Sequence, residues 1–110
     1  MDNFQNYLPV RNCEYEINNE LVTVLFQKEQ KGFIEKKLFP KLKPKTNKID
    51  LDEIGSFIWL RIDGENNISE ITKIAEEHFQ DKISPAKERV ELFFQQMFRN
   101  KLISLYEKKK

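Results

Sequence analysis

Apolar and polar positions alternate along much of the first half of the chain, which predicts strands. Residues 13–17 alternate apolar with charged side chains, the period of a half-buried strand. Residues 21–26, Leu-Val-Thr-Val-Leu-Phe, are apolar and β-branched, which favours a second strand. Asn18-Asn19 lies between them, and asparagine tolerates the left-handed backbone of a tight turn, so we expect a two-residue hairpin there. Lys48–Leu51 alternates again and predicts a short third strand.

Three helices are expected in the second half, each with a recognisable start. Asp52 can cap the first, and Asn67 can cap the second, with Glu70 three residues later as in a capping box. Ser84-Pro85 opens the third, with proline at the first helical position. The apolar stripes at helical spacing are Ile54, Phe57, Ile58 and Ile62, then Ile68, Ile71, Ile74, Ala75 and Phe79, then Val90, Phe93, Phe94, Met97 and Phe98. Strands followed by helices predict an α+β domain of winged helix-turn-helix type, with a three-stranded antiparallel sheet followed by three helices.

Residues 27–47 and the end of the chain fit these patterns less well. The first segment contains Gly32, Pro40 and Pro44, and we expect a basic excursion with some helix. From Lys28 to Lys48 there are eight lysines and two glutamates, a charge of +6, so with a net charge of +1 the rest of the chain carries −5. Residues 102–106 form a short apolar segment, which is followed by the lysines at positions 108–110.

Composition narrows the class of protein. A chain of 110 residues, with 39% hydrophobic and 34% charged residues, is typical of one globular domain. Its single cysteine, Cys13, excludes an internal disulfide framework. The first residues lack the basic and apolar regions of a signal peptide, and no apolar run approaches the roughly 20 residues that span a bilayer. We therefore expect a cytoplasmic protein.

Side chains that could act in catalysis or bind a metal are few and isolated in the sequence. Cys13 has no partnered histidine, which favours a packed thiol over a nucleophile. His78, the only histidine, lies beside Glu76 and Glu77 and is expected at the surface, because further ligands at metal-binding spacing are missing. Trp59 is expected in the core. The sequence thus predicts no enzyme activity, no cofactor and no metal.

Four segments, in this order and spacing, resemble the PqqD family (coenzyme PQQ synthesis protein D-like). They are Tyr7-Leu8-Pro9-Val10-Arg11-Asn12, then residues 51–59 with a small residue before an apolar-apolar-Trp step, then Ile62-Asp63-Gly64 leading to Glu70-Ile71, and finally the closing pair Leu102-Ile103. The resemblance covers about residues 7–103. Two features depart from it: Lys101 stands where the family often has glycine, and the basic excursion is longer than in the shortest members.

The resemblance implies a single peptide-recognition domain over residues 1–110, with 1–6 and 107–110 as flexible tails. Such a domain, a recognition element for ribosomally made precursor peptides, binds the leader segment of a precursor and presents it to a modifying enzyme. In PqqD itself that enzyme is a radical S-adenosylmethionine protein. Related domains bind the leader as an added strand beside the third strand, over the third helix.

The expected peptide site combines an open strand edge with an apolar helix flank. Phe94 and Phe98 lie about 100° around the third helix from the stripe of Val90, Phe93 and Met97. Either all five are core residues, or Phe94 or Phe98 lines a groove. The predicted peptide-binding residues are Lys48, Ile49, Asp50, Leu51, Lys87, Glu91, Phe94 and Phe98.

An alternative function is a winged-helix nucleic-acid binder that uses the basic Lys28–Lys48 segment against phosphates. The third helix argues against it, because it mixes Lys87 and Arg89 with Glu88 and Glu91. No membrane partner is expected. An exposed strand edge would allow a monomer or a weak homodimer.

Overall fold

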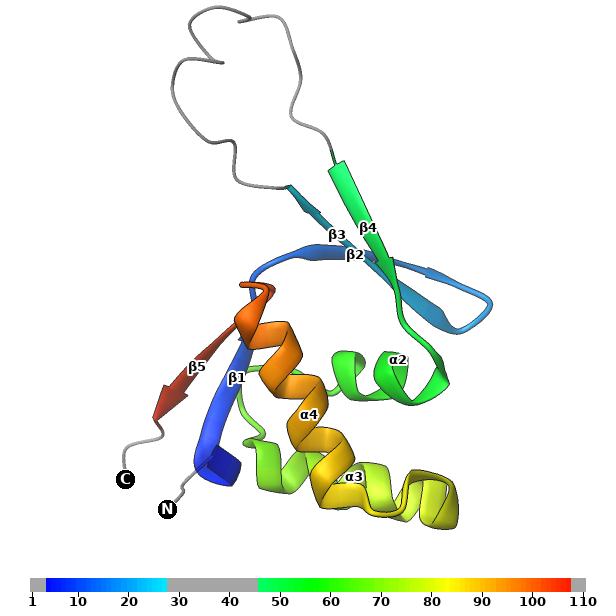
Figure 1. Cartoon of the computed structure of the whole chain (residues 1–110), viewed down its shortest axis with the longest axis vertical. Coiled ribbons are helices and arrows are strands. Elements are labelled where there is room, and N and C mark those ends of the chain that lie inside the picture. The colour runs from blue at the N-terminus through cyan, green and yellow to red at the C-terminus, as the bar shows by residue number, and fades with distance from the viewer. Residues whose placement is uncertain (1–3, 28–45, 108–110) are drawn as a thin grey trace, which may run out of the picture.

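The computed structural model describes residues 4–27 and 46–107, which form two small sheets and three α-helices (Figure 1). In chain order the elements are η1 (Phe4–Asn6), β1 (Tyr7–Arg11), β2 (Glu14–Asn18), β3 (Leu21–Gln27), β4 (Thr46–Asp50), α2 (Glu53–Leu60), α3 (Ile68–Phe79), η2 (Gln80–Ile83), α4 (Ala86–Arg99) and β5 (Ile103–Glu107). Most of the basic excursion, residues 28–45, lies outside the described residues, as do residues 1–3 and 108–110.

The larger sheet is antiparallel, in the order β2-β3-β4, and contains the three expected strands. Asn18 pairs with Leu21, so the two-residue turn is Asn19-Glu20, one position later than the sequence predicted. Both turn residues have positive φ, 53° and 68°, the conformation that matches the twist of a hairpin. β4 also begins and ends earlier than expected, at Thr46 and Asp50.

The smaller sheet joins the two ends of the chain. β1 pairs antiparallel with β5, from Tyr7 opposite Glu107 to Arg11 opposite Ile103. Residues 4–6, at the end of the expected N-terminal tail, form η1, and Glu107 is the last residue of β5. The apolar segment at residues 102–106 contributes to a strand because it pairs with β1. The two paired segments are more than 90 residues apart in the sequence, so no local pattern reveals the pairing.

The helix starts are confirmed at the atomic level. The Asp52 carboxylate accepts the Gly55 N–H at 2.8 Å, and Asn67 and Glu70 form a reciprocal capping box at α3. Pro85 occupies the N-cap of α4 rather than the first helical position. Between α2 and α3, Asp63 Oδ1 accepts the N–H groups of Asn66 and Glu65. These bonds hold the pKa of its carboxyl below the ordinary range.

The core lies between the β2-β3-β4 sheet and the helices, which Figure 1 shows below that sheet. Trp59 is fully buried and packs edge-on against Tyr15 with ring centroids 6.1 Å apart, which confirms its core position. Ser56 Oγ accepts the Val22 N–H at 2.8 Å and so ties α2 to β3. Sheet first, then three helices and a closing strand: the α+β winged fold is confirmed. Within the described ranges, no helix is long and apolar enough to cross a membrane.

Candidate functional site

β4 is an edge strand whose outer side carries unpaired backbone groups within the described part of the chain. Its inner side pairs with β3, and this ladder continues to Leu51, whose N–H donates to the Val22 carbonyl at 2.9 Å. Successive residues of an antiparallel strand point their backbone groups alternately toward and away from the partner. Ile49 therefore bonds to β3, whereas Lys48 and Asp50 turn their N–H and C=O groups outward.

The side chains of β4 alternate between the two faces of the sheet. Ile49 lies opposite Val24, is half-buried, and faces the helices. Lys48 and Asp50 are exposed on the other face, where Asp50 accepts the Thr23 hydroxyl at 2.7 Å. Leu51 was expected in the edge, but it lies beyond β4 and is 9% exposed. It belongs to the core.

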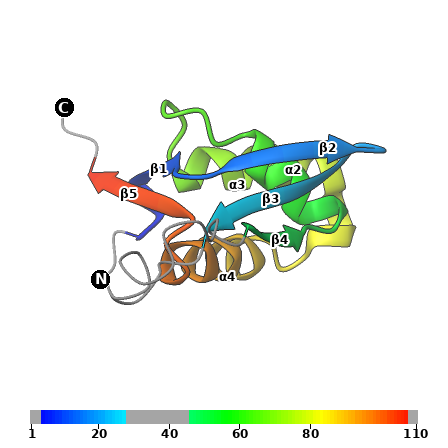
Figure 2. The same ribbon diagram turned by 90° about the horizontal axis from the view of Figure 1, so that it is seen from above.

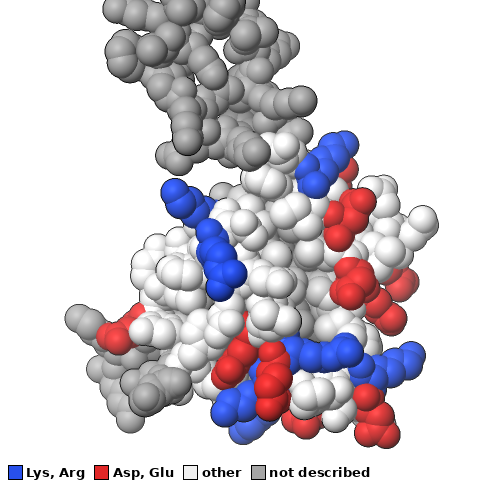
Figure 3. Space-filling view, viewed as in Figure 1, with Lys and Arg blue, Asp and Glu red and all other residues white. Residues whose placement is uncertain are grey.

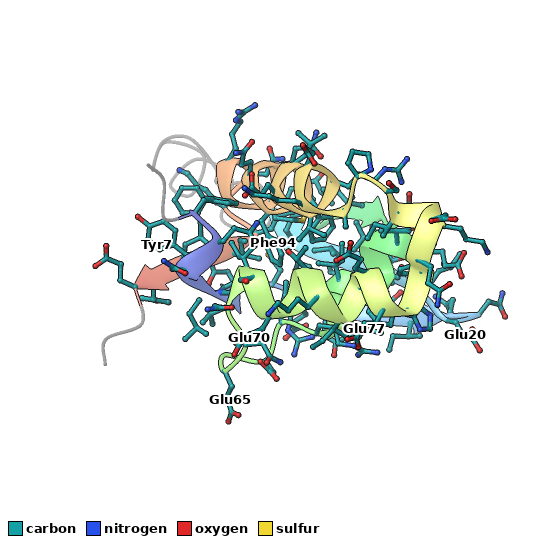
Figure 4. The ribbon with its side chains drawn as sticks, turned by 90° about the horizontal axis from the view of Figure 1, so that it is seen from below. Tyr7, Glu20, Glu65, Glu70, Glu77 and Phe94 are labelled. Carbon is teal, nitrogen blue, oxygen red and sulfur yellow. The ribbon has the colours of Figure 1, made fainter. Side chains whose placement is uncertain are left out.

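One face of α4 packs into the core. Val90 and Phe94 are fully buried and Met97 nearly so. Figure 4 shows the Phe94 side chain between α4 and α3. The assignment of Phe94 to a peptide-binding surface is thus corrected, because a ring with 0% exposure offers a ligand no surface.

The two flanks of this buried face point to different parts of the molecule. On one flank, the half-buried Phe93 approaches α2 so closely that a Cβ on Gly55 would lie 3.3 Å from its ring. On the other, Glu91 accepts the Gln5 amide of η1 at 2.7 Å. Helical spacing puts Lys87 and Phe98 on the Glu91 flank. The predicted residues Lys87, Glu91 and Phe98 are therefore turned toward η1, away from the side that faces β4 and α2.

Phe93 is a half-buried aromatic residue of α4 that lies beside Gly55 of α2, and the sequence reasoning did not select it. A Cβ on Gly55 would lie 3.3 Å from this ring and 3.4 Å from the Leu51 Cβ, so the ring lies near the start of α2, just after β4. Figure 2 shows β4 as the strand of its sheet nearest to α4. Helical spacing grouped Phe93 with Val90 and Met97 as core residues. A helical wheel gives the angle of each side chain around the helix, but it does not show which neighbouring element each flank of the helix contacts. Gly55 was the available sequence signal, because a residue without a side chain leaves room for a ring from another element to approach.

Two features near the start of α2 could contact an extended peptide: the outward backbone groups of β4 and the half-buried Phe93. The backbone groups of Lys48 and Asp50 can bind a strand of any sequence, whereas Ile49 and Phe93 offer apolar contact to alternate side chains. Around them, the face in Figure 3 carries Lys and Arg interspersed with Asp and Glu. The first turn of α4 exposes Glu88 between Lys87 and Arg89, so it is not a uniformly basic recognition surface.

Cys13 and His78, the other side chains considered for catalysis or metal binding, lie where the sequence predicted. Cys13 is half-buried and packs against the core, and burial raises the pKa of its thiol, which lowers the fraction of thiolate. His78 is exposed and stacks on Phe57 with centroids 4.4 Å apart. No group of three or more metal-ligating side chains occurs within residues 4–27 and 46–107.

Comparison with known proteins assigns the chain to a family. The sequence profile of the PqqD family, coenzyme PQQ synthesis protein D, matches residues 41–103, more than half of the chain. The chain belongs to the PqqD family. The matched segment runs from β4 through α4 to the first residue of β5, and so contains both parts of the candidate surface. No curated protein and no solved structure matches the chain.

Membership also settles the broad class of activity. PqqD proteins are non-catalytic chaperones that bind ribosomally made precursor peptides, so the expectation that the chain is not an enzyme is confirmed by its family. Precursor peptides and the enzymes that modify them are the general partners of this family.

Proposed function

We propose that this chain binds the leader segment of a precursor peptide along the outer edge of β4 and presents the peptide to a modifying enzyme. One observation carries the proposal. The outward backbone groups of Lys48 and Asp50 lie on a strand that runs into α2 where Phe93 of α4 borders the junction. A leader strand would therefore gain backbone hydrogen bonds and apolar contact in one place.

The alternation of β4 predicts what kind of leader fits. Leader side chains on the Ile49 face would lie toward α2 and α4, and small to medium apolar residues suit this position. Those on the opposite face would lie beside Lys48 and Asp50 and can be polar. Burying one leucine or aromatic residue supplies roughly 1.5–3 kcal/mol. A leader with apolar residues at every second position should bind best.

The rest of the surface is left for the enzyme that receives the peptide. A strand on β4 would leave exposed most of α3, whose Glu70 and Glu77 lie on the outer surface in Figure 4. In PqqD itself the receiving enzyme is a radical S-adenosylmethionine protein, and a radical enzyme of this class is the first partner to test here.

Proline substitutions test the edge directly, with a leader peptide that carries apolar residues at every second position as probe. Lys48→Pro removes one outward N–H and keeps the β3–β4 ladder, so we expect unchanged folding and binding weaker by about 1–3 kcal/mol. Ile17→Pro is the matched control. Asn18 closes the β2–β3 turn, so Ile17 turns its N–H outward from β2, at the opposite edge of the sheet.

Amide shift mapping by NMR supplies the independent measurement. Titration with the leader should move the signals of β4 and of α4 around Phe93. Perturbations restricted to β2 or α3, or equal losses of affinity in Lys48→Pro and Ile17→Pro, would show that the β4 edge is not the site. Ile49→Pro is unsuitable for this test, because it breaks the ladder to β3.

A further inference from the structure

The smaller sheet ends in an edge with no assigned role. The Asn12 N–H donates to the Leu102 carbonyl at 2.9 Å and continues the register that pairs Arg11 with Ile103. By alternation, Tyr7, Pro9 and Arg11 turn their backbone groups away from β5. Ile103, Leu105 and Glu107 likewise turn theirs away from β1.

The two edges of this ribbon differ in their capacity to pair. Proline has no N–H, so Pro9 removes the central donor from the outer edge of β1 and protects that edge against a further strand. β5 contains no proline, and within the described residues it pairs with β1 alone. Beside it, Tyr106 is 55% exposed, and Phe98 near the end of α4 is 51% exposed.

The sequence of β5 also fits a second copy of itself. Antiparallel pairing about a two-fold axis at Leu105 places Leu105 opposite Leu105, Ile103 opposite Glu107, and Ser104 opposite Tyr106. All the outward residues of both strands then form hydrogen-bonded pairs, about six backbone hydrogen bonds in total. Glu107 is the only charged residue of β5. In this pairing it lies opposite Ile103 of the second copy, two residues after that copy's Lys101.

The other open edges fail the same comparison. Two β4 strands paired through their outward residues would place Lys48 opposite Lys48. Two β2 strands paired through Tyr15 and Ile17 would place Glu16 opposite Glu16. Like charges directly opposite each other destabilise a pair of strands. Of the described strands, β5 alone combines a full set of outward donors with a self-pairing free of opposed like charges.

We infer that the chain forms a two-fold symmetric homodimer through β5, which joins the two ribbons into a four-stranded sheet in the order β1-β5-β5-β1. The interface is isologous, so each copy contributes the same residues. The β4 edges of the two copies stay free, and the dimer offers two peptide sites. This inference is independent of what β4 binds.

Sedimentation equilibrium up to millimolar concentration tests it. The wild-type protein should show a reversible monomer–dimer equilibrium. Ser104→Lys combined with Tyr106→Lys places two lysine pairs opposite each other across the axis and should weaken the dimer at least about tenfold. Tyr106 is 55% exposed, whereas the half-buried Ser104 exchanges hydrogen bonds with the Asn12 side chain, which the variant loses. Circular dichroism must therefore show that the variant still folds before its dimerisation is compared. Mixing this variant with one that carries Ser104→Glu and Tyr106→Glu should restore a dimer containing one chain of each.

Leu105→Pro removes the donor at the axis, and Lys48→Pro is its control, because it leaves the dimer intact if β5 forms the interface. If Leu105→Pro does not fold, the lysine and glutamate pairs decide. A wild-type chain that stays monomeric at millimolar concentration would overturn the inference. So would a dimer that both charge variants leave unchanged.

Discussion

At the scale of single residues, three phenylalanines within one helix have three different environments. Phe94 is fully buried, Phe93 is half-buried beside Gly55, and Phe98 is 51% exposed. Their side chains are chemically identical, so the difference comes from the angle at which each leaves α4 and from its position along the helix, where Phe98 lies in the last turn. This placement decides whether a substitution affects stability, binding or neither.

Alanine substitutions should separate these environments. Phe94→Ala should cost about 3–5 kcal/mol of folding stability, because it leaves a cavity in the core. Phe93→Ala should weaken leader binding by roughly 1–3 kcal/mol, with a smaller loss of stability. Phe98→Ala should change both by less than about 1 kcal/mol in dilute solution. Urea unfolding and titration calorimetry measure the two quantities. A full loss of stability in Phe93→Ala with no effect on binding would return Phe93 to the core.

At the scale of elements, the residue preferences of helix caps match the structure, whereas one residue of the β2–β3 turn has a backbone conformation that its side chain disfavours. The Asp52 and Asn67 caps form as predicted, because each depends on residues at most three positions away. The hairpin turn contains Glu20 with a φ of 68°. A side chain at such a φ clashes with the following carbonyl, so this position stores conformational strain.

Glu20→Gly should therefore stabilise the protein. Glycine adopts positive φ without steric cost, and Asn-Gly is a preferred two-residue turn. After the larger entropy loss of glycine on folding, a net gain of about 0.5–1 kcal/mol is expected in thermal or urea unfolding. Glu20→Ala is the control, because it keeps a Cβ and so keeps the strain. Equal effects of alanine and glycine would attribute the change to the lost charge.

At the scale of the whole molecule, the edge proposed to bind a leader and the edge proposed to pair with a second copy lie in different sheets. β4 belongs to the sheet over the core, and β5 belongs to the ribbon formed by the chain ends, as Figure 1 shows. This separation lets one edge bind a leader while the other pairs with a second copy. Charge is also divided, with +6 between Lys28 and Lys48 and −5 in the rest.

We expect the lysine-rich segment to speed the capture of acidic partners. Solvent-exposed charges in general raise association rates with partners of opposite charge, and salt screens such charges over about 10 Å at ~0.1 M. Changing Lys41, Lys43 and Lys45 together to glutamine should slow association with an acidic leader at low salt and leave dissociation nearly unchanged. Stopped-flow binding measures both rates. An on-rate that does not change at low salt would reduce the segment to a solvated loop.

The sequence by itself determined the α+β class, the hairpin strands, the helix starts and the core position of Trp59. Each of these depends on neighbours a few positions away, through alternation, helical spacing or a capping side chain. The family resemblance added the idea of a peptide beside the third strand. Only the tertiary structure decided the rest. It paired β1 with β5 across the length of the chain, and it placed Phe94 in the core and Phe93 beside Gly55 of α2. These outcomes follow from which elements pack together, and spacing along one helix carries no information about that.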